Sequence, residues 1–336
     1  MGFDVSSHPV DVALIQTRLL PYLRGQGTPR DLDDLVAEAV RHAKVRFRAN
    51  AWGLGLVELK ASDEAAAKAN RKAREPAPTA VPKSFDPDLH VWGRPYFVTA
   101  PTPDVSAVID RYLAATPTQA DAIAMEQLHT LHPNLPNLVQ PDTEGALPDD
   151  DILARGLRED LELLRDSYGH LAGGKPVKMP DGESVDPEDL FLFTMPLSVL
   201  TFAAHLQPGW MARGHVWFTQ YVADADLDAD GLIESSASLF EPLLKGIGGW
   251  EEAFQPTITQ NYTLGGYVRP ANVPAFRVWW EAHQAELVAP FVAENDGDTG
   301  AVCWLKIREA LLDAERRKFA LVEATEVYSG FMGVMN

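Results

Sequence analysis

The stretch Asp224–Glu234 carries the most distinctive chemistry in the sequence. Its residues run Asp224-Ala-Asp226-Leu-Asp228-Ala-Asp230-Gly231-Leu232-Ile233-Glu234, so that aspartates alternate with small or apolar side chains. A loop that binds a hard cation needs carboxylate oxygens at alternate positions, and a glycine after them permits the sharp turn that brings the oxygens together. The spacing therefore indicates a possible Ca²⁺ or Mg²⁺ loop whose candidate ligands are Asp226, Asp228, Asp230 and Glu234.

Over about nine residues this stretch resembles the calcium loop of an EF-hand. It departs from that pattern at the twelfth position, where the EF-hand has a bidentate glutamate and this sequence has Ala237. A site without that side chain would lose two oxygen ligands. The simpler interpretation is an acidic turn in which Asp230 caps a helix that runs from Leu232 onward.

The motif Glu126-x-x-His129-x-x-His132 is a second arrangement of metal-binding side chains. On a helix Glu126 and His129 would share one face, as in carboxylate-bridged di-metal bundles. Those bundles need a second Glu-x-x-His motif, which this sequence lacks, so we expect surface or helix-end histidines. Serine-hydrolase, zinc-protease and phosphate-loop motifs are also missing from the sequence.

Aromatic residues are the other candidates for a binding function. The chain has eight tryptophans, and Trp279 and Trp280 are adjacent within a helical pattern over 274–293. Together with Tyr262 and Tyr267 they could line a binding surface, although tryptophans more commonly build a core. Adjacent residues cannot both face inward on one helix, so we expect one of the two tryptophans at a boundary.

Charge and composition limit the classes of partner. The chain of 336 residues has 48 acidic and 29 basic residues, a formal charge of −19, which disfavours nucleic acid and suits a basic partner or a cation. Cys303 is the single cysteine, so an intramolecular disulfide is impossible. The sequence shows neither a signal-peptide pattern nor an apolar run of membrane-span length, and we expect a soluble cytoplasmic protein without membrane association.

The pattern of apolar residues predicts a helix-rich α+β fold. We expect many amphipathic helices around a central buried helix at about 188–206, together with one or two small sheets. Strand patterns at Trp52–Leu59 and Phe319–Val327 follow helical patterns near both ends of the chain, and we expect them to pair. The proline-rich segment 76–89 suggests a linker between an N-terminal lobe, 1–75, and a larger lobe, 90–336, although the two could share one core.

Two hypotheses for function follow. The first is a non-enzymatic accessory protein, immunity-like in character, that needs no cofactor and uses an acidic and aromatic surface to hold a protein or peptide partner, preferably a basic one. The second is a metal-dependent enzyme or metal-regulated protein that uses the Asp224–Glu234 loop with Ca²⁺ or Mg²⁺ as its cofactor.

Overall fold

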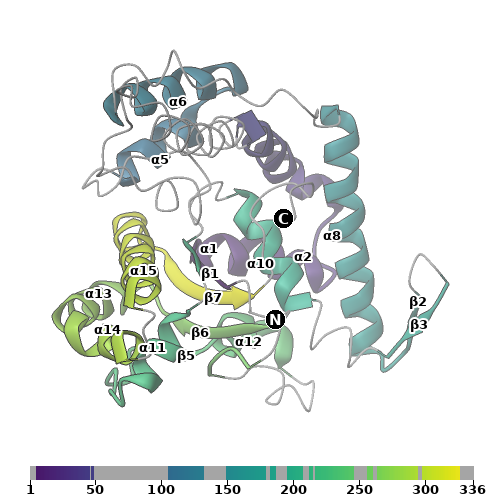
Figure 1. Cartoon of the computed structure of the whole chain (residues 1–336). Helices are drawn as coiled ribbons and strands as arrows, with labels where there is room; N and C mark the ends of the chain where they lie inside the picture. Colours follow the sequence, from purple (N-terminus) through teal and green to yellow (C-terminus); the bar gives the residue numbers. More distant parts are fainter. Residues whose placement is uncertain are drawn as a thin grey trace, which may run out of the picture. The chain divides into compact units, whose positions relative to one another are not determined.

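The computed structural model describes residues 5–45, 47–48, 105–131, 149–178, 182–186, 195–206, 212–214, 216–245, 256–259, 263–293 and 297–325 (Figure 1). The chain divides into two compact units. The first, here the sheet unit, comprises Met1–Val40, Pro148–Gln207 and Met211–Ser329, and the second comprises Arg41–Leu147, Pro208–Trp210 and Gly330–Asn336. The predicted lobes 1–75 and 90–336, with the linker 76–89, stay predictions, since residues 49–104 lie outside the described residues.

The fold is helix-rich α+β with a small antiparallel sheet, which confirms the predicted class. The five strands lie in the order β4 (Ala212–Gly214), β1 (Val5–Val10), β7 (Ala320–Thr325), β6 (Leu264–Val268) and β5 (Glu234–Ser235). Every neighbouring pair is antiparallel, and all residues of β1, β6 and β7 are buried. A separate ribbon joins β2 (Val177–Lys178) to β3 (Ser184–Val185).

The central strand of the sheet is β7, which confirms the strand predicted at Phe319–Val327. Its neighbours are β1 on one side, from Val5↔Thr325 to Val10↔Ala320, and β6 on the other. The expected pairing of Phe319–Val327 with Trp52–Leu59 stays a prediction, because Trp52–Leu59 lies outside the described residues. Gly265 and Gly266 lie within the buried strand β6.

Helices of the sheet unit occupy both faces of the sheet. They are α1 (Val12–Leu14), the π-helical turn η1 (Ile15–Leu19), α2 (Leu20–Leu23), the 3-10 turn η2 (Pro29–Leu32), a helix at 33–40 that continues to 45, α8 (Asp150–Ala172), α10 (Met195–Leu206), α11 (Phe218–Asp224), α12 (Ala237–Leu244), α13 (Val273–Ala282), α14 (Gln284–Ala293) and α15 (Gly297–Arg317). α10 contacts β1 from one side, and α15 contacts β1, β4 and β7. None of the helices in the described part of the chain is long and apolar enough to cross a lipid bilayer.

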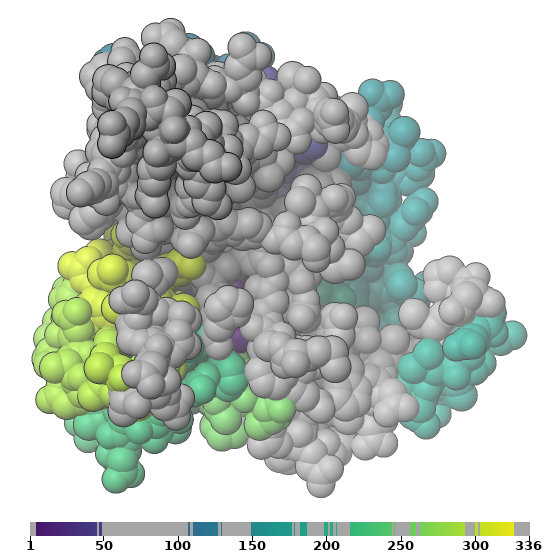
Figure 2. Space-filling view, in the orientation of Figure 1, coloured from purple at the N-terminus to yellow at the C-terminus, as the bar shows by residue number. Residues whose placement is uncertain are grey.

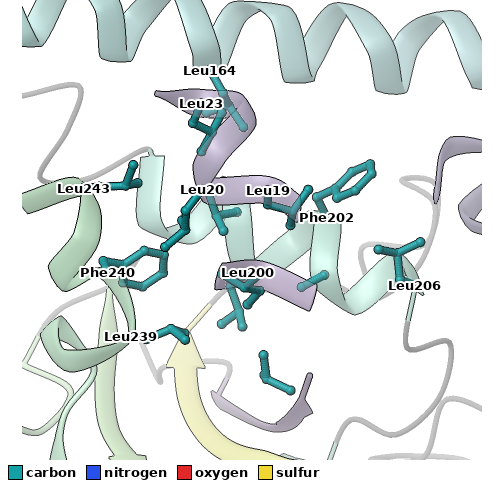
Figure 3. Close-up of a cluster of buried hydrophobic side chains, with 14 of the residues drawn as sticks. Leu19, Leu20, Leu23, Leu164, Leu200, Phe202, Leu206, Leu239, Phe240 and Leu243 are labelled. Carbon is teal, nitrogen blue, oxygen red and sulfur yellow. The ribbon is translucent and has the colours of Figure 1, made fainter. Parts of the chain in front are cut away.

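The main hydrophobic core lies on the sheet face that carries Ala320, Val322 and Ala324. Side chains from η1, α2, α8, α10 and α12 converge on it, as Figure 3 shows for Leu19, Leu20, Leu23, Leu164, Leu200, Phe202, Leu206, Leu239, Phe240 and Leu243. Short helical turns near the N-terminus therefore contribute as much to this core as the longer helices do.

Helix α10 supplies five buried side chains to this core: Val199, Leu200, Phe202, Ala203 and Leu206. It covers the second half of the helix predicted at 188–206, and residues 187–194 lie outside the described residues. The central position expected of that helix stays a prediction.

Helix α8 shows how sequence signals set the limits of an element. Asp149 is its N-cap, and Asp150 and Asp151 lie in the first turn, where carboxylates interact favourably with the helix dipole. The chain leaves the helix through Gly173 and Gly174, and Gly174 has a φ of 62°. Such a left-handed residue after a helix closes a Schellman motif, and glycine adopts it without strain.

The second unit contains the helices α5 (Val105–Ala114) and α6 (Pro117–Leu131). Tyr112 of α5 is fully buried, and the Arg111 guanidinium binds both carboxylate oxygens of Glu126 at 2.8 and 2.6 Å. This ion pair holds the pKa of the Glu126 carboxyl below its usual range. His129 is exposed, and His132 lies outside the described residues.

We predict that Leu200→Ala destabilises the protein by about 2–5 kcal/mol, because Leu200 is fully buried in the main core and its truncation leaves a cavity. Denaturant unfolding measures the loss. The matched control is Ile152→Ala on α8, whose side chain is 48% exposed and whose truncation should cost less than about 1 kcal/mol. Equal losses in the two variants would contradict the position of α10 in the core.

Candidate functional site

The Asp-rich segment begins where α11 ends. Leu227 N–H donates to Val222 O at 3.1 Å and Asp226 N–H donates to Ala223 O at 3.1 Å, which is the Schellman pattern of hydrogen bonds. Asp226 has a φ of 51° and takes the left-handed position that glycine usually fills. Aspartate tolerates this conformation better than most residues.

A tight turn completes the segment. Asp228 Oδ1 accepts from Asp230 N–H at 2.9 Å, and Leu232 N–H donates to Ala229 O at 2.9 Å. Asp230 and Gly231 have φ values of 51° and 70°, so the turn has two consecutive left-handed residues, as Asp-Gly hairpin turns do. The chain then enters β5, and the next helix, α12, begins at Ala237. The expectation of a helix from Leu232 onward, capped by Asp230, was therefore wrong.

We call residues 224–230 the acidic loop, because its aspartate side chains are exposed. Asp224, Asp226, Asp228 and Asp230 are all exposed, whereas Ala229 is buried and anchors the loop. None of the four aspartates is paired with a cation in the described residues. The loop is thus an ordered turn with unneutralised negative charge.

Glu234, the fourth candidate metal ligand, has a different environment. It lies on β5, opposite Tyr267 of β6, and Arg269 and the Ser238 hydroxyl bind its carboxylate. The hydrogen bond from Arg269 lowers the pKa of the Glu234 carboxyl. Within the described residues no group of three or more His, Cys, Asp or Glu side chains is placed to hold a metal ion. The Ca²⁺ or Mg²⁺ loop at Asp226, Asp228, Asp230 and Glu234 stays a prediction.

The adjacent tryptophans of α13 have different environments, which confirms that one of them lies at a boundary. Trp280 is fully buried, with ring centroids 5.3 Å from Tyr221 and 6.3 Å from Trp304. Trp279 is half-buried and stacks between Phe276 at 5.7 Å and His283 at 4.6 Å.

The two candidate tyrosines do not add to an exposed aromatic surface in the described residues. Tyr267 is 3% exposed within the main core, and burial raises the pKa of its hydroxyl. Tyr262 lies outside the described residues. Among the aromatic candidates that the structure describes, Trp279 is the one that reaches the surface.

The helices α13 and α14 carry a set of exposed apolar residues near Trp279 in sequence, which we name the α13–α14 stripe. Its members are all exposed and recur at steps of three and four residues: Ala275, Val278, Ala282, Ala285, Ala289 and Val292. The two valines are the most informative, since Val278 is 56% and Val292 60% exposed. In Figure 2 the yellow-green helices α13 and α14 lie at the surface above the teal-green segment of α11, and α14 contacts α11 directly. The acidic loop follows α11, so the stripe and the loop belong to neighbouring elements.

A buried carboxyl group lies beneath α11, and the sequence did not reveal it. Glu323 of β7 is fully buried, and its carboxylate accepts from Thr219 N–H at 3.1 Å, from Gly266 N–H at 2.7 Å and from the Thr219 hydroxyl. A Cβ on Gly265 would collide with this carboxylate, which explains why a glycine occurs within a buried strand.

Hydroxyl groups connect Glu323 to the half-buried Thr257. The Thr219 and Thr257 Oγ1 atoms are 2.6 Å apart, and Trp217 Nε1–H donates to Thr257 Oγ1 at 2.9 Å. Either threonine can donate to the other. The Thr219 hydroxyl can therefore accept a hydrogen bond from a neutral Glu323 carboxyl or donate one to the ionised form. Burial raises the pKa of Glu323 to about 7, against the hydrogen bonds from Thr219 and Gly266, which lower it.

We predict that Glu323→Gln changes how stability depends on pH. The folded pKa of about 7 lies above the ordinary 4.5, so the folded state holds this proton more tightly than the unfolded state does. The contribution of the protonated Glu323 carboxyl to stability is complete below pH 4.5 and is lost as the pH rises through about 7. The free energy of unfolding of the wild type should thus fall by about 3 kcal/mol relative to that of the variant over this range.

Chemical denaturation at a series of pH values measures this difference. Glu286→Gln on α14 is the control, because Glu286 is exposed and its removal should leave the pH profile of the wild type unchanged. Parallel profiles for the wild type and Glu323→Gln would show that Glu323 does not titrate in this range.

The two tryptophans give a second prediction. Trp280→Ala should cost about 3–5 kcal/mol, because the indole is enclosed by other rings and a large cavity would remain. Trp279→Ala should cost about 1–2 kcal/mol, because less apolar area returns to water. Unfolding by denaturant measures both, and a larger loss for Trp279→Ala would refute the assignment of Trp279 to the boundary.

The chain matches no protein-family model, and no curated protein or solved structure is significantly similar to it. The functional conclusion rests on the geometry of the sheet unit. Three features of the sheet unit could contact a partner: the exposed acidic loop, the exposed α13–α14 stripe, and the half-buried Trp279, which lies within the sequence range of the stripe.

Proposed function

We propose that this protein is a binding or accessory protein that holds a basic, amphipathic segment of a protein or peptide partner. The acidic loop would attract the basic side chains of the partner, and the α13–α14 stripe would cover its apolar side. An immunity-like role, in which an acidic protein masks a basic surface, is one form of this function.

One observation carries the proposal: the four exposed aspartates of the acidic loop have no cationic partner in the described residues, whereas many other carboxylates do. Pairs elsewhere in the sheet unit include Arg18–Asp34, Arg158–Asp33, Arg277–Glu315 and Arg317–Asp313. Folding thus neutralises part of the acidic excess locally and leaves the loop charged. An exposed, concentrated charge speeds the encounter with an oppositely charged partner and helps to select it.

The α13–α14 stripe supports the apolar half of the proposal. On each of the consecutive helices α13 and α14, exposed valine and alanine side chains recur at steps of three and four residues. A helix face of this kind can accept the apolar face of another helix. Trp279 adjoins Val278 in sequence and is half-buried, so it can add contact area at the margin. Several exposed apolar residues on consecutive helices are more informative than single ones, because one partner can bury them together.

One observation supports the alternative of a metal-dependent enzyme or metal-regulated protein. The left-handed backbone at Asp226 and Asp230 gives the loop two sharp bends, as a cation-binding loop needs. Ca²⁺ or Mg²⁺ at about 5 mM would raise the melting temperature if either ion binds the folded protein selectively. The Asn variants of the loop aspartates described below should abolish such a rise. A rise that survives in them would place the ion elsewhere.

The test of the proposed function uses a synthetic amphipathic helix with lysines on one face and leucines on the other, labelled for fluorescence anisotropy. A peptide of the same composition in scrambled order is the probe control. The loop variant replaces its four aspartates by asparagine, which retains both the left-handed conformation and the side-chain oxygen that Asp228 uses. We expect it to bind about tenfold more weakly at low salt and with a shallower dependence on salt.

A matched variant removes the same number of charges elsewhere on the sheet unit. Its substitutions are at exposed residues: Glu159→Gln, Asp160→Asn, Glu162→Gln and Glu241→Gln. This control should bind nearly as well as the wild type, whereas Val278→Ser with Val292→Ser should weaken binding even at high salt. Equal weakening in the loop variant and the charge control would mean that only net charge matters, and the proposed site would be wrong.

A further inference from the structure

A second feature of the sheet unit lies away from the acidic loop. A surface pocket of about 470 Å³ is formed between the end of α2 and the last turn of α8, which contact each other directly. Figure 1 shows α2 beside α8. This volume is within the range of pockets that hold small molecules.

The lining of the pocket is basic, although the chain as a whole is strongly acidic. Arg24, Arg165, His170 and Lys175 line it, with Asp166 as the acidic member of the lining. Three permanent cations against one carboxylate leave a local charge of +2, in a chain whose formal charge is −19. In the described residues, the basic lining side chains form no ion pair.

Arg165 is held in place at the wall of the pocket. Its Nη2 donates to Gly25 O at 3.0 Å and to Gly27 O at 3.1 Å, and the guanidinium lies 4.7 Å from the centre of the Tyr22 ring. No carboxylate pairs with this guanidinium among the described residues, so its charge remains available to a ligand. A fixed guanidinium binds phosphate and carboxylate groups well, because little side-chain entropy is lost.

Cations at a helix C-terminus often serve only to interact with the helix dipole. Here the last carbonyls of α8 are already bonded by the backbone: Gly173 N–H donates to Gly169 O, Gly174 N–H to Leu171 O and Lys175 N–H to His170 O, at 2.9–3.2 Å. The basic side chains are therefore not needed to close the helix. A Cβ at Gly25 or Gly169 would meet no atom within 4 Å, so both glycines border open space.

We propose that this pocket binds a small anion with at least two negative charges, carried by phosphate or carboxylate groups. Arg165 would fix the orientation of the anion, and Arg24 and Lys175 would contribute charge from the two sides of the pocket. The site is independent of the proposed partner surface, because it uses different elements and a ligand of opposite charge.

Isothermal titration calorimetry of the full chain at low ionic strength, with pyrophosphate and with citrate as probes, tests this proposal. We expect saturable binding of at least one probe. Preference for pyrophosphate indicates a phosphorylated ligand, and preference for citrate indicates a polycarboxylate. Arg24→Ala combined with Lys175→Ala should weaken binding about tenfold for each charge removed. Arg155→Ala, an exposed arginine of α8 outside the pocket, is the control and should change the affinity by less than about twofold.

Acetylation of lysines in the wild type, followed by mass spectrometry, gives a measurement that needs no variant. Pyrophosphate or citrate should slow the modification of Lys175 and leave that of the exposed Lys245 unchanged. Failure to saturate at about 10 mM of either probe, equal weakening by Arg155→Ala, or equal protection of both lysines would overturn the proposal.

Discussion

The buried carboxyl of Glu323 is the constraint on which the sheet unit depends. A charged or neutral carboxyl in a dry interior needs hydrogen-bond partners, and here they come from the start of α11 and from β6. Thr219 and Gly266 must therefore approach β7 closely, which requires glycines in β6. The same contacts fix the start of α11, and so they determine where the acidic loop leaves the body of the protein.

Helices α13 and α14 combine two kinds of surface within a short segment. Phe276 and Trp280 lie in the aromatic core under α13, whereas the α13–α14 stripe on the opposite side faces water. Arg277 binds Glu281 within α13 and Glu315 of α15, and so joins α13 to α15. The packing of α13 and α14 against α15 and α11 is thus separate from the surface that we propose for the partner. The exposed residues can therefore be changed without disrupting the core.

The spacing of apolar residues predicted the elements in which apolar side chains are buried and polar side chains face water. The strand β7 and the different environments of Trp279 and Trp280 followed from spacing alone. β1 was missed because Ser6, Ser7 and His8 are polar yet buried, and Ser6 satisfies His8 with a hydrogen bond of 2.6 Å. β6 was missed because its glycines are required by contacts with residues far along the chain. Glu323 was missed for a related reason: an acidic residue in a strand is normally expected to face water. The α13–α14 stripe escaped notice because alanines fit either side of a helix.

The pairing of β1 with β7 also has a consequence for the order in which the protein can fold. β1 is made before the other strands of the sheet, and its partner β7 follows more than 300 residues later. Until then β1 and β6 have no strand between them, and their buried side chains remain exposed to the solvent. Bringing β1 and β7 together reduces the conformational entropy of the long intervening chain before the strand contacts stabilise the sheet. The sheet is therefore expected to form late in folding. A chain that ends before Ala320 would therefore lack the central strand of its sheet rather than an edge strand.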